Sequence, residues 1–325
     1  MKCNYPVRMY RGIDGSVSHY PNKVQFRDPS NPQLGISDFQ RPCGQCMNCR
    51  IRRASDWSVR MYHEASLYPE PSSFITLTYD DYSLKTPSLN YVDFTLFMKK
   101  LRKQLSPRPI SFYRVGEYGS NFSRPHFHAI IFGYDFRDKR VYKRSENIIA
   151  PSSDRSYKSQ FLTDLWGNGF ADASHADIAS MMYVAKYVTK KLKVSEYDDL
   201  YLEPEKASMS KKNPIGSRWL EKFYTDVYPK DFVTIDSKKF QPPKYYDRWL
   251  EKFHPDLYLV VKRKREDSMS HEFASPRELY DSTLISIDRQ KAFLRDGCAP
   301  NFSSDKAILD EHFINLNHFS NKGVL

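Results

Sequence analysis

The sequence lacks any apolar run that approaches the ~18 residues needed to cross a bilayer, so we expect no membrane span. Residues 1–6, MKCNYP, also lack the apolar stretch of a signal peptide. Cysteines are few and odd in number, with 5 among 325 residues. These features predict a protein of a reducing cytoplasm, in which a disulfide framework is not expected.

The sequence also contains no G-x-x-x-x-G-K-[ST] stretch, so an ATP-driven helicase is not indicated. It is rich in positive charge and in aromatic rings: the formal net charge is +11, and aromatic residues make up 15% of the chain. Disordered chains are poor in aromatic residues, so the composition indicates a folded protein. The charge favours a polyanionic partner, with nucleic acid ahead of an anionic membrane.

Helices and strands are predicted to alternate between residues 50 and 193. Apolar periodicity indicates helices over 50–68, 91–105, 156–165 and 177–193. Runs of β-branched and aromatic residues indicate strands near 74–79, 110–118, 126–132 and 169–174. Asn90 is placed to cap the second helix, and the short connection 119–125 makes a hairpin of the strands beside it. The order predicts an α+β fold with a central, mainly antiparallel sheet flanked by helices.

We expect three parts: a loop-rich, Cys-rich segment over 1–55, a core over 56–195, and a basic, aromatic region over 196–325 that contacts DNA or a partner. In the last part, RWLEKF at 218–223 recurs at 248–253, which indicates two similar amphipathic helices. The basic run KRKR at 262–265 could contact phosphates or could be a solvated strand end.

Two histidines of the predicted hairpin share one face of the sheet, because alternate residues of a strand point the same way. They are His126 and His128. Pairing across the connection places Glu117 beside His126. One carboxylate and two imidazoles with open coordination positions suit Mg²⁺ or Mn²⁺ acting on phosphate. Two satisfied sheet histidines and an exposed strand-end carboxylate would give the same pattern.

Two tyrosines four residues apart lie opposite the apolar stripe of the helix predicted over 177–193. They are Tyr183 and Tyr187, and this placement predicts hydroxyls that are free of the core. Lys186 and Lys190 lie near the same face. A phenol is a weak nucleophile at neutral pH, and a nearby ammonium or cation can assist it. Two ordinary surface tyrosines remain the alternative. The apolar stripe consists of Ile178, Met181, Met182, Ala185, Val188 and Leu192.

Three cysteines follow one another at the spacing of metal ligands, at Cys43, Cys46 and Cys49. Cys3 could complete a tetrahedral Cys₄ zinc site that fastens the N-terminal segment to the helix after it. Reduced thiols in a turn are the alternative, and an iron–sulfur cluster is a weaker one. Cys298 stands apart as an ordinary thiol.

Four blocks together resemble the HUH (His–hydrophobic–His) endonucleases and, more closely, the replication initiation proteins of the gokushovirus branch of the microviruses. The blocks are PCGQCMNCR at 42–50, FITLTY at 74–79, GEYG at 116–119 with RPHFH at 124–128, and YVAKYVTK at 183–190. The resemblance covers roughly residues 1–250, and the His and Tyr blocks are specific in combination.

The resemblance implies a metal-dependent endonuclease and ligase that initiates rolling-circle replication of a small phage genome. His126 and His128 would bind the divalent metal, with Glu117 as third ligand. Tyr183 or Tyr187 would attack the phosphate and form a 5′-phosphotyrosine, and Lys186 or Lys190 would steady the developing charge. The expected partners are single-stranded DNA at the phage origin, a host helicase and a host DNA polymerase, all in the bacterial cytoplasm.

Basic side chains next to these blocks are expected to contact DNA: Arg50, Arg52, Arg53 and Arg124. Two other functions stay open. A non-catalytic single-stranded nucleic-acid-binding protein explains the charge and the aromatic residues, but leaves the histidine and tyrosine pairs without a role. An HUH-type transposase or relaxase would share the chemistry and differ in its substrate.

Overall fold

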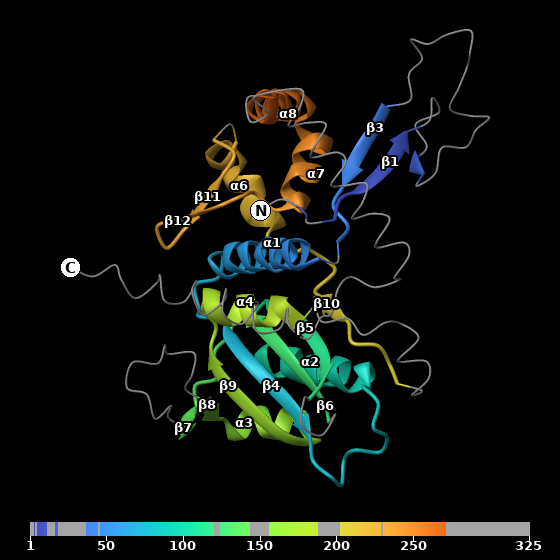
Figure 1. Cartoon of the computed structure of the whole chain (residues 1–325). Coiled ribbons are helices and arrows are strands. Elements are labelled where there is room, and N and C mark those ends of the chain that lie inside the picture. Colours follow the sequence, from blue (N-terminus) through green and yellow to red (C-terminus); the bar gives the residue numbers. More distant parts are fainter. Residues whose placement is uncertain are drawn as a thin grey trace. The chain divides into compact units, whose positions relative to one another are not determined.

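A computed structural model describes residues 3, 5–11, 17–18, 37–44, 46–119, 124–143, 156–187, 202–228 and 230–270 (Figure 1). The predictions for Lys190, for Cys298 and for the helix beyond residue 187 fall outside these residues. The chain divides into two compact units, one of residues 1–52 with 264–325 and one of residues 53–263. Helix α1 (Met47–Ala65) begins in the first unit and continues in the second.

The first unit contains a small antiparallel sheet in the order β2-β1-β3. Its strands are β1 (Val7–Arg11), β2 (Val17–Ser18) and β3 (Ser37–Arg41). Val7 at the start of β1 pairs with Arg41 at the end of β3. This pairing brings the residues before β1 close to those after β3, although about forty residues of chain separate them.

A seven-stranded sheet forms the centre of the second unit, in the order β10-β5-β6-β4-β9-β8-β7, and each of its pairs is antiparallel. The strands are β4 (Ser73–Tyr79), β5 (Ser111–Tyr118), β6 (Pro125–Phe132), β7 (Arg140–Lys143), β8 (Ser156–Lys158), β9 (Gly169–His175) and β10 (Ala207–Met209). The predicted α+β fold with a mainly antiparallel sheet is therefore confirmed.

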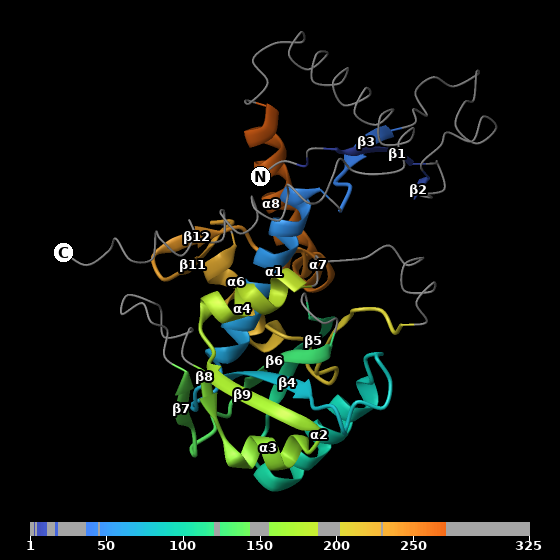
Figure 2. The same cartoon turned by 60° about the horizontal axis from the view of Figure 1, so that its bottom comes forward.

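The two faces of this sheet carry different helices (Figures 1 and 2). Helices α2 (Tyr91–Leu105) and α3 (Gln160–Trp166) pack on one face, against Ile75, Leu77 and Phe127. Helix α4 (Ile178–Tyr187) packs on the other face, against β5 and β6. Because side chains alternate along a strand, the residues between those of the first face point toward the side of α4.

Helix α2 forms as its sequence predicts. The Asn90 side chain accepts a hydrogen bond from the Val92 backbone N–H at 3.1 Å and so caps the first turn. The apolar residues recur every three or four positions and turn one stripe toward the sheet, where four of them are buried: Phe94, Phe97, Met98 and Leu101.

The helix predicted over 156–165 begins later than expected. Residues 156–158 form strand β8, in which Tyr157 pairs with Ala173. The Ser159 hydroxyl then accepts a hydrogen bond from the Leu162 backbone N–H at 3.0 Å and starts α3. A serine cap inside the predicted stretch marks the change, because it satisfies an N–H group of the first helical turn.

The recurring hexapeptides form two helices, as predicted: α6 (Ser217–Val227) and α7 (Lys244–Phe253). Leu220 and Leu250 hold the same place in the repeat, and both are fully buried in one core. Between the helices lies the hairpin of β11 (Val233–Ile235) and β12 (Lys238–Phe240). Residues 262–265 belong to helix α8 (Pro255–Ser270), so the strand-end interpretation of the basic run was wrong.

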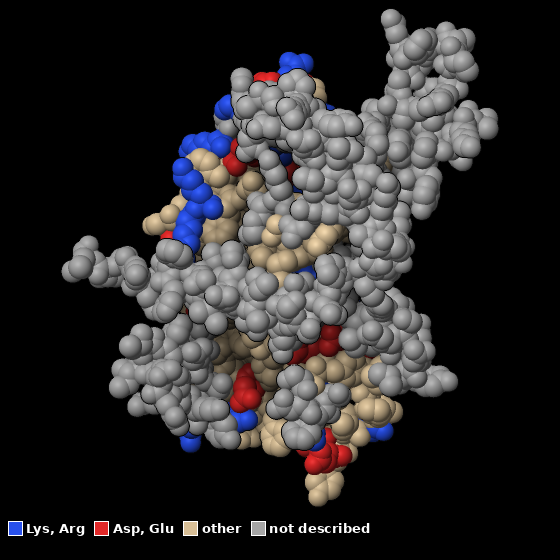
Figure 3. Space-filling model, in the orientation of Figure 1, with Lys and Arg blue, Asp and Glu red and all other residues tan. Residues whose placement is uncertain are grey.

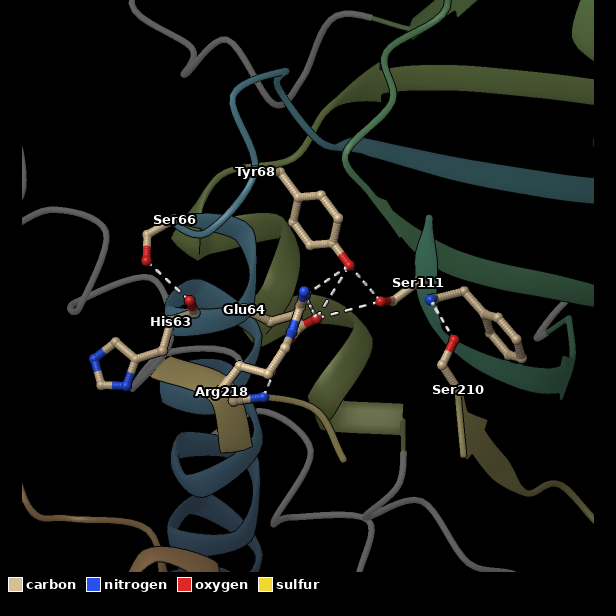
Figure 4. A network of polar contacts seen from close by, with 9 residues as sticks. His63, Glu64, Ser66, Tyr68, Ser111, Ser210 and Arg218 are labelled. Atoms are coloured by element: carbon tan, nitrogen blue, oxygen red, sulfur yellow. Dashed lines mark hydrogen bonds and ion pairs between the residues drawn. The ribbon is translucent and has the colours of Figure 1, made fainter. Parts of the chain in front are cut away.

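A buried carboxylate joins α1, β5 and α6 within the second unit (Figure 4). Glu64 is fully buried, and its Oε1 accepts hydrogen bonds from Arg218 at 2.8 Å and from the Ser111 hydroxyl at 3.2 Å. Its Oε2 accepts from the Gly216 backbone N–H at 3.0 Å. The Tyr68 hydroxyl donates to Oε1 at 3.2 Å. Such full satisfaction is what makes a charge tolerable in an apolar interior.

Among the described residues, no helix combines the length and the apolar character that crossing a lipid bilayer requires.

Candidate metal centre and tyrosine pair

The hairpin of β5 and β6 brings the predicted metal ligands together. Glu117 pairs directly with His126 in the strand register, and Val115 pairs with His128. The Glu117 Oε1 atom lies 2.8 Å from His126 Nε2 and 3.3 Å from His128 Nε2. All three residues point to the side of α4, and one ligand atom from each lies within 4.8 Å of the others.

The far nitrogens of the two imidazoles are held by other groups. His126 Nδ1 lies 3.0 Å from the Arg124 carbonyl oxygen, and His128 Nδ1 lies 3.0 Å from the Thr76 hydroxyl. A carbonyl can only accept, so His126 carries its proton on Nδ1 when the ring is neutral. Its Nε2 lone pair then faces the Glu117 carboxylate at 2.8 Å, a contact that needs a proton or a cation between the two atoms.

The electrostatics of Glu117 also fit a cation. Burial disfavours the charged carboxylate, but hydrogen bonds from His126 and His128 outweigh this effect and lower the pKa of Glu117 to about 2. Its second oxygen, Oε2, is buried and has no hydrogen-bond partner. A buried, ionised oxygen of this kind is costly unless a cation or a donor satisfies it. The three residues therefore fit a divalent metal with open coordination positions.

The tyrosine pair of α4 lies against one of these imidazoles. The ring of Tyr187 is stacked on His128 with centroids 5.1 Å apart, and the ring of Tyr183 meets His128 edge-on at 5.7 Å. The Tyr187 hydroxyl donates a hydrogen bond to the Tyr183 hydroxyl. Both hydroxyls consequently lie together at the metal-ligand cluster, as the four-residue spacing predicts.

One part of the tyrosine prediction was wrong. Tyr183 is 44% exposed, but Tyr187 is only 8% exposed and belongs to the buried side chains of α4. The helix buries Met181 and Ala185 on one side as well as Val184 and Tyr187 on the other. A helix covered on both sides has no solvent face on which to place its fourth-residue pair.

The pKa of Tyr183 is raised by several neighbours. Burial is the largest cause, the hydrogen bond from Tyr187 acts in the opposite direction, and the negative charge of Glu117 adds to the rise. Tyr183 is therefore protonated at neutral pH in the bare site. A positive charge next to Glu117 would reverse the last contribution.

The predicted basic residues differ in their surroundings. Lys186 lies in the last turn of α4, between the two tyrosines in sequence, and is half-buried. Arg124 donates to the Tyr79 carbonyl at 2.8 Å and to the Asp81 carboxylate at 2.5 Å, so its guanidinium ties the hairpin connection to the end of β4. Three further arginines lie half-buried on α1: Arg50, Arg52 and Arg53.

The four predicted zinc ligands come together in the first unit. Their sulfur atoms all lie within 4.8 Å of one another. The Sγ of Cys3 is 3.5 Å from that of Cys43 and 3.7 Å from that of Cys46, and Cys43 is 4.0 Å from Cys49. Four thiolates at about 2.3 Å from a zinc ion would be about 3.8 Å apart, so the cluster has the size of a tetrahedral site.

Backbone geometry supports this cluster. Gly44 has a positive φ of 77°, which lets the chain turn tightly after Cys43. The Cys43 backbone N–H donates to Cys3 Sγ and the Cys46 backbone N–H to Cys43 Sγ, both at 3.3 Å. Burial raises the pKa of Cys49 and of Cys3, so the thiols stay neutral without a cation. The four cysteines are free thiols with no disulfide among them.

Sequence reasoning missed two residues of the site. Thr76 holds His128 through its hydroxyl, and the ring of Phe74 lies 5.6 Å from that of His128 and 6.0 Å from that of Tyr183. Both sit at alternate positions of β4, in the strand that was predicted. The register between β4 and β6, where Thr76 pairs with His128, would have revealed them.

Known proteins similar to this chain come from phages. Residues 72–192 match the family model of the replication-associated protein ORF2. The chain is 30% identical over 254 residues to the replication-associated protein VP4 of Bdellovibrio phage phiMH2K, a match that covers 76% of each protein. It is 30% identical over 313 residues to the replication-associated protein ORF2 of Spiroplasma virus 4, covering 91% of this chain and 93% of the relative.

A third relative, the replication-associated protein ORF4 of Chlamydia phage 1, is 29% identical over 228 residues, which cover 66% of this chain and 54% of the relative. No solved structure gives a significant match. The matched segment 72–192 contains the Glu117–His126–His128 cluster and both tyrosines. By these similarities over most of its length, the chain belongs to the family of phage replication-associated proteins, as its sequence motifs predict.

Proposed function

We propose that this protein is an endonuclease and strand transferase of the HUH type, which cuts and rejoins one DNA strand at a phage origin during rolling-circle replication. One observation carries the proposal: both tyrosines of α4 lie against His128, within the cluster that Glu117 and His126 complete. A carboxylate, two imidazoles and two phenols at one point of a sheet suit phosphoryl transfer to a tyrosine.

Glu117, His126 and His128 would hold a divalent cation, Mg²⁺ or Mn²⁺. When bound, the cation supplies Lewis-acid activation of a phosphate oxygen and a positive charge that offsets Glu117. Thr76 and the Arg124 carbonyl fix the orientation of the two imidazoles from behind. The buried Oε2 of Glu117 gives the site a further acceptor for the same cation.

Tyr183 is proposed as the nucleophile of the first cut, because it is the exposed member of the pair and accepts the hydrogen bond from Tyr187. Its oxygen forms a bond to phosphorus while the bond between phosphorus and the 3′ oxygen breaks. The phenol proton leaves to solvent, the 3′ oxygen becomes a hydroxyl, and the 5′ phosphate stays on the tyrosine. One phosphoester replaces another, so the same site can run the step backwards and rejoin the strand.

Tyr187 is proposed to make the second cut, on the regenerated origin. After Tyr183 carries DNA, the neighbouring hydroxyl is the next phenol within reach of the same ligands. Lys186 and Lys190 are proposed to steady negative charge during either step. The released 3′ hydroxyl would prime a host DNA polymerase, and a host helicase would separate the strands.

The Cys3–Cys43–Cys46–Cys49 cluster is proposed to hold structural zinc, on the strength of its sulfur spacing and its backbone N–H donors. Arg50, Arg52, Arg53 and Arg124 are proposed DNA contacts. The region 196–325 is proposed to add further DNA or partner contacts. Figure 3 shows Lys and Arg side chains gathered where α6 and the β11–β12 hairpin lie, and Lys222, Lys230 and Lys239 are exposed there.

The test is the covalent intermediate. Purified protein is incubated with Mn²⁺ and single-stranded oligonucleotides that tile the phage genome, and a denaturing gel reports DNA-linked protein. We expect an adduct that disappears with chelator and in the Tyr183→Phe/Tyr187→Phe double variant. Tyr82→Phe is the matched control, because Tyr82 is 99% exposed and outside the cluster. DNA binding without any adduct or nick would instead support a non-catalytic nucleic-acid-binding protein. Cutting at mobile-element ends rather than a phage origin would indicate a transposase or relaxase.

A further inference from the structure

An exposed aromatic ring lies on the same sheet face as the proposed metal ligands. Phe170 is 58% exposed, although β9 is an interior strand between β4 and β8. Its neighbour Ala171 belongs to the core on the face of α2 and α3, so Phe170 points to the opposite face. A large apolar side chain so exposed in the interior of a sheet is unusual enough to require a reason.

The strand register places Phe170 in one row with the metal ligands. Glu117 pairs with His126, His126 pairs with Thr78, and Thr78 pairs with Phe170. Adjacent strands are about 4.8 Å apart, so the Phe170 backbone lies about 10 Å from that of His126. Thr78 is only partly buried, and a small hydroxyl side chain therefore separates the imidazole from the aromatic ring.

Helix α4 covers the other half of this face. It packs against β5 and β6, on the side of the row where Glu117 and His126 lie. On the β4 and β9 side, Thr76, Thr78 and Asp172 keep partial exposure and Phe170 is exposed. The described part of the chain thus presents a partly open strip that starts at the metal ligands and ends at an aromatic ring.

The charges beside the strip balance each other. Lys158 on β8 pairs with Asp172 at 3.0 Å, and its ammonium lies 5.8 Å from the centre of the Phe170 ring. The strip itself is neutral, with an aromatic face and threonine hydroxyls. That chemistry suits a nucleobase, whereas a phosphate suits the cation site at the other end of the row.

The backbone at the start of β9 is built for this placement. Gly169 has a φ of 130°, and a Cβ atom there would lie 2.3 Å from the Asp80 backbone nitrogen. Only glycine allows β9 to begin so close to the end of β4. The next residue is Phe170, whose position is therefore set by a tight backbone contact rather than by a loop.

We propose that Phe170 is the stacking platform for a nucleobase next to the phosphate held at Glu117, His126 and His128. The proposal rests on the proposed function, because it names how that site holds its single-stranded DNA. An unpaired base has an exposed π-face, which stacks on an aromatic ring with little regard to sequence. The row then holds the strand at two points, with the base on Phe170 and the phosphate at the metal ligands.

The experiment compares three variants of the full chain with the wild type in binding a fluorescent single-stranded oligonucleotide. Phe170→Ala should weaken binding about 5- to 100-fold, the range expected for the loss of one base–aromatic stack. Phe170→Trp should retain or improve it. Phe253→Ala is the matched control, because Phe253 on α7 is similarly exposed at 54%. All variants are checked for folding by circular dichroism and for Mn²⁺ binding by electron paramagnetic resonance.

The salt dependence supplies a second readout. Stacking involves no counterion release, so Phe170→Ala should lower affinity at every salt concentration without changing the slope of log K against log [salt]. An affinity for Phe170→Ala within about twofold of the wild type, or an equal loss in Phe253→Ala, would overturn the stacking role while adduct formation still supports the endonuclease. A wild type that binds no single-stranded DNA would overturn both proposals.

Discussion

The ring of Tyr187 lies parallel to the ring of His128, with centroids 5.1 Å apart and planes inclined by 16°. Tyr183 meets the same imidazole edge-on, at 81°. The two tyrosines are four residues apart on one helix, yet one is packed flat against a proposed metal ligand and the other is open to solvent. Several measurable consequences follow from this asymmetry and from the groups around it.

The tyrosines should fail differently when each loses its hydroxyl. Tyr183→Phe should abolish the first covalent adduct. Tyr187→Phe should slow it about 10-fold, because one hydrogen bond to the attacking oxygen is lost, and should block transfer of a second strand. Single-turnover adduct assays and mass spectrometry of the DNA-linked peptide measure both steps. An adduct on residue 187 in the wild type during the first turnover would reverse the assignment.

Thr76 should matter to metal binding through His128. Thr76→Val keeps the shape of the side chain but removes the hydroxyl that bonds to Nδ1, and loss of such a group commonly weakens metal binding by about 10- to 100-fold. Thr78→Val is the matched control, since Thr78 lies two residues along the same face of β4. Isothermal titration with Mn²⁺ compares the two. Equal affinities would show that the Thr76 hydroxyl does not orient the ligand.

The cysteine cluster should carry one zinc ion per chain. Native mass spectrometry should detect this ion in the wild type and in Cys298→Ser, which removes the one cysteine outside the cluster. Cys46→Ser should lose it, because the buried Cys46 thiol is one of the four ligands. Proteolysis should then cut within the N-terminal segment, since zinc binding is coupled to the folding of such segments. Zinc retained in Cys46→Ser would place the ion elsewhere.

His63 should make the fold sensitive to acid. Burial lowers the pKa of His63 to about 3, whereas an unfolded chain protonates histidine near pH ~6.5. The unfolded state therefore binds the proton first as the pH falls. Stability from neutral His63 is fully present above about pH 6.5 and is lost toward pH 3, by roughly 2–3 kcal/mol at pH 4.5. Urea unfolding at about pH 7.5 and about pH 4.5 measures this loss, and His63→Phe should lose less. An equal loss in both proteins would assign the effect to other groups.

Glu64 should be far more important to stability than a carboxylate on the surface. Glu64→Gln leaves Arg218 without its charged partner inside the second unit, and breaking a buried pair costs about 3–5 kcal/mol. Glu70→Gln is the control, because Glu70 is partly exposed beside Arg108 and Arg137, and such pairs contribute about 0–1 kcal/mol. Chemical denaturation distinguishes the two values. Similar losses for both variants would mean that the network around Glu64 adds no net stability.

Local pattern was sufficient for much of this molecule. The cap at Asn90, the hairpin that sets Glu117 beside His126, and the helices of the repeated hexapeptide each depend on neighbours a few residues apart. The α+β class followed from the order of these elements. The burial of Tyr187 did not follow, because it depends on what covers α4 from outside the helix.

The contacts of Thr76, Phe74 and Phe170 were missed for a related reason. They depend on how β4 pairs with β6 and β9, strands that are distant in sequence, and a shift of one residue in either register would turn these side chains to the other face. The cysteine cluster was predicted because its spacing is local at 43–49, and Cys3 joined it through the pairing of β1 with β3.

The bonds of Glu64 to residues 111, 216 and 218 have a consequence for how such proteins can diverge. A recombination junction placed between α4 and α6 would combine a carboxylate from one parent with an arginine and a backbone amide from another. Unless the donor parent carried the same partners, the hybrid would bury an uncompensated charge. We therefore expect residues 53–263 to be exchanged between phage genomes as a single block, with crossovers tolerated only toward the ends of the gene.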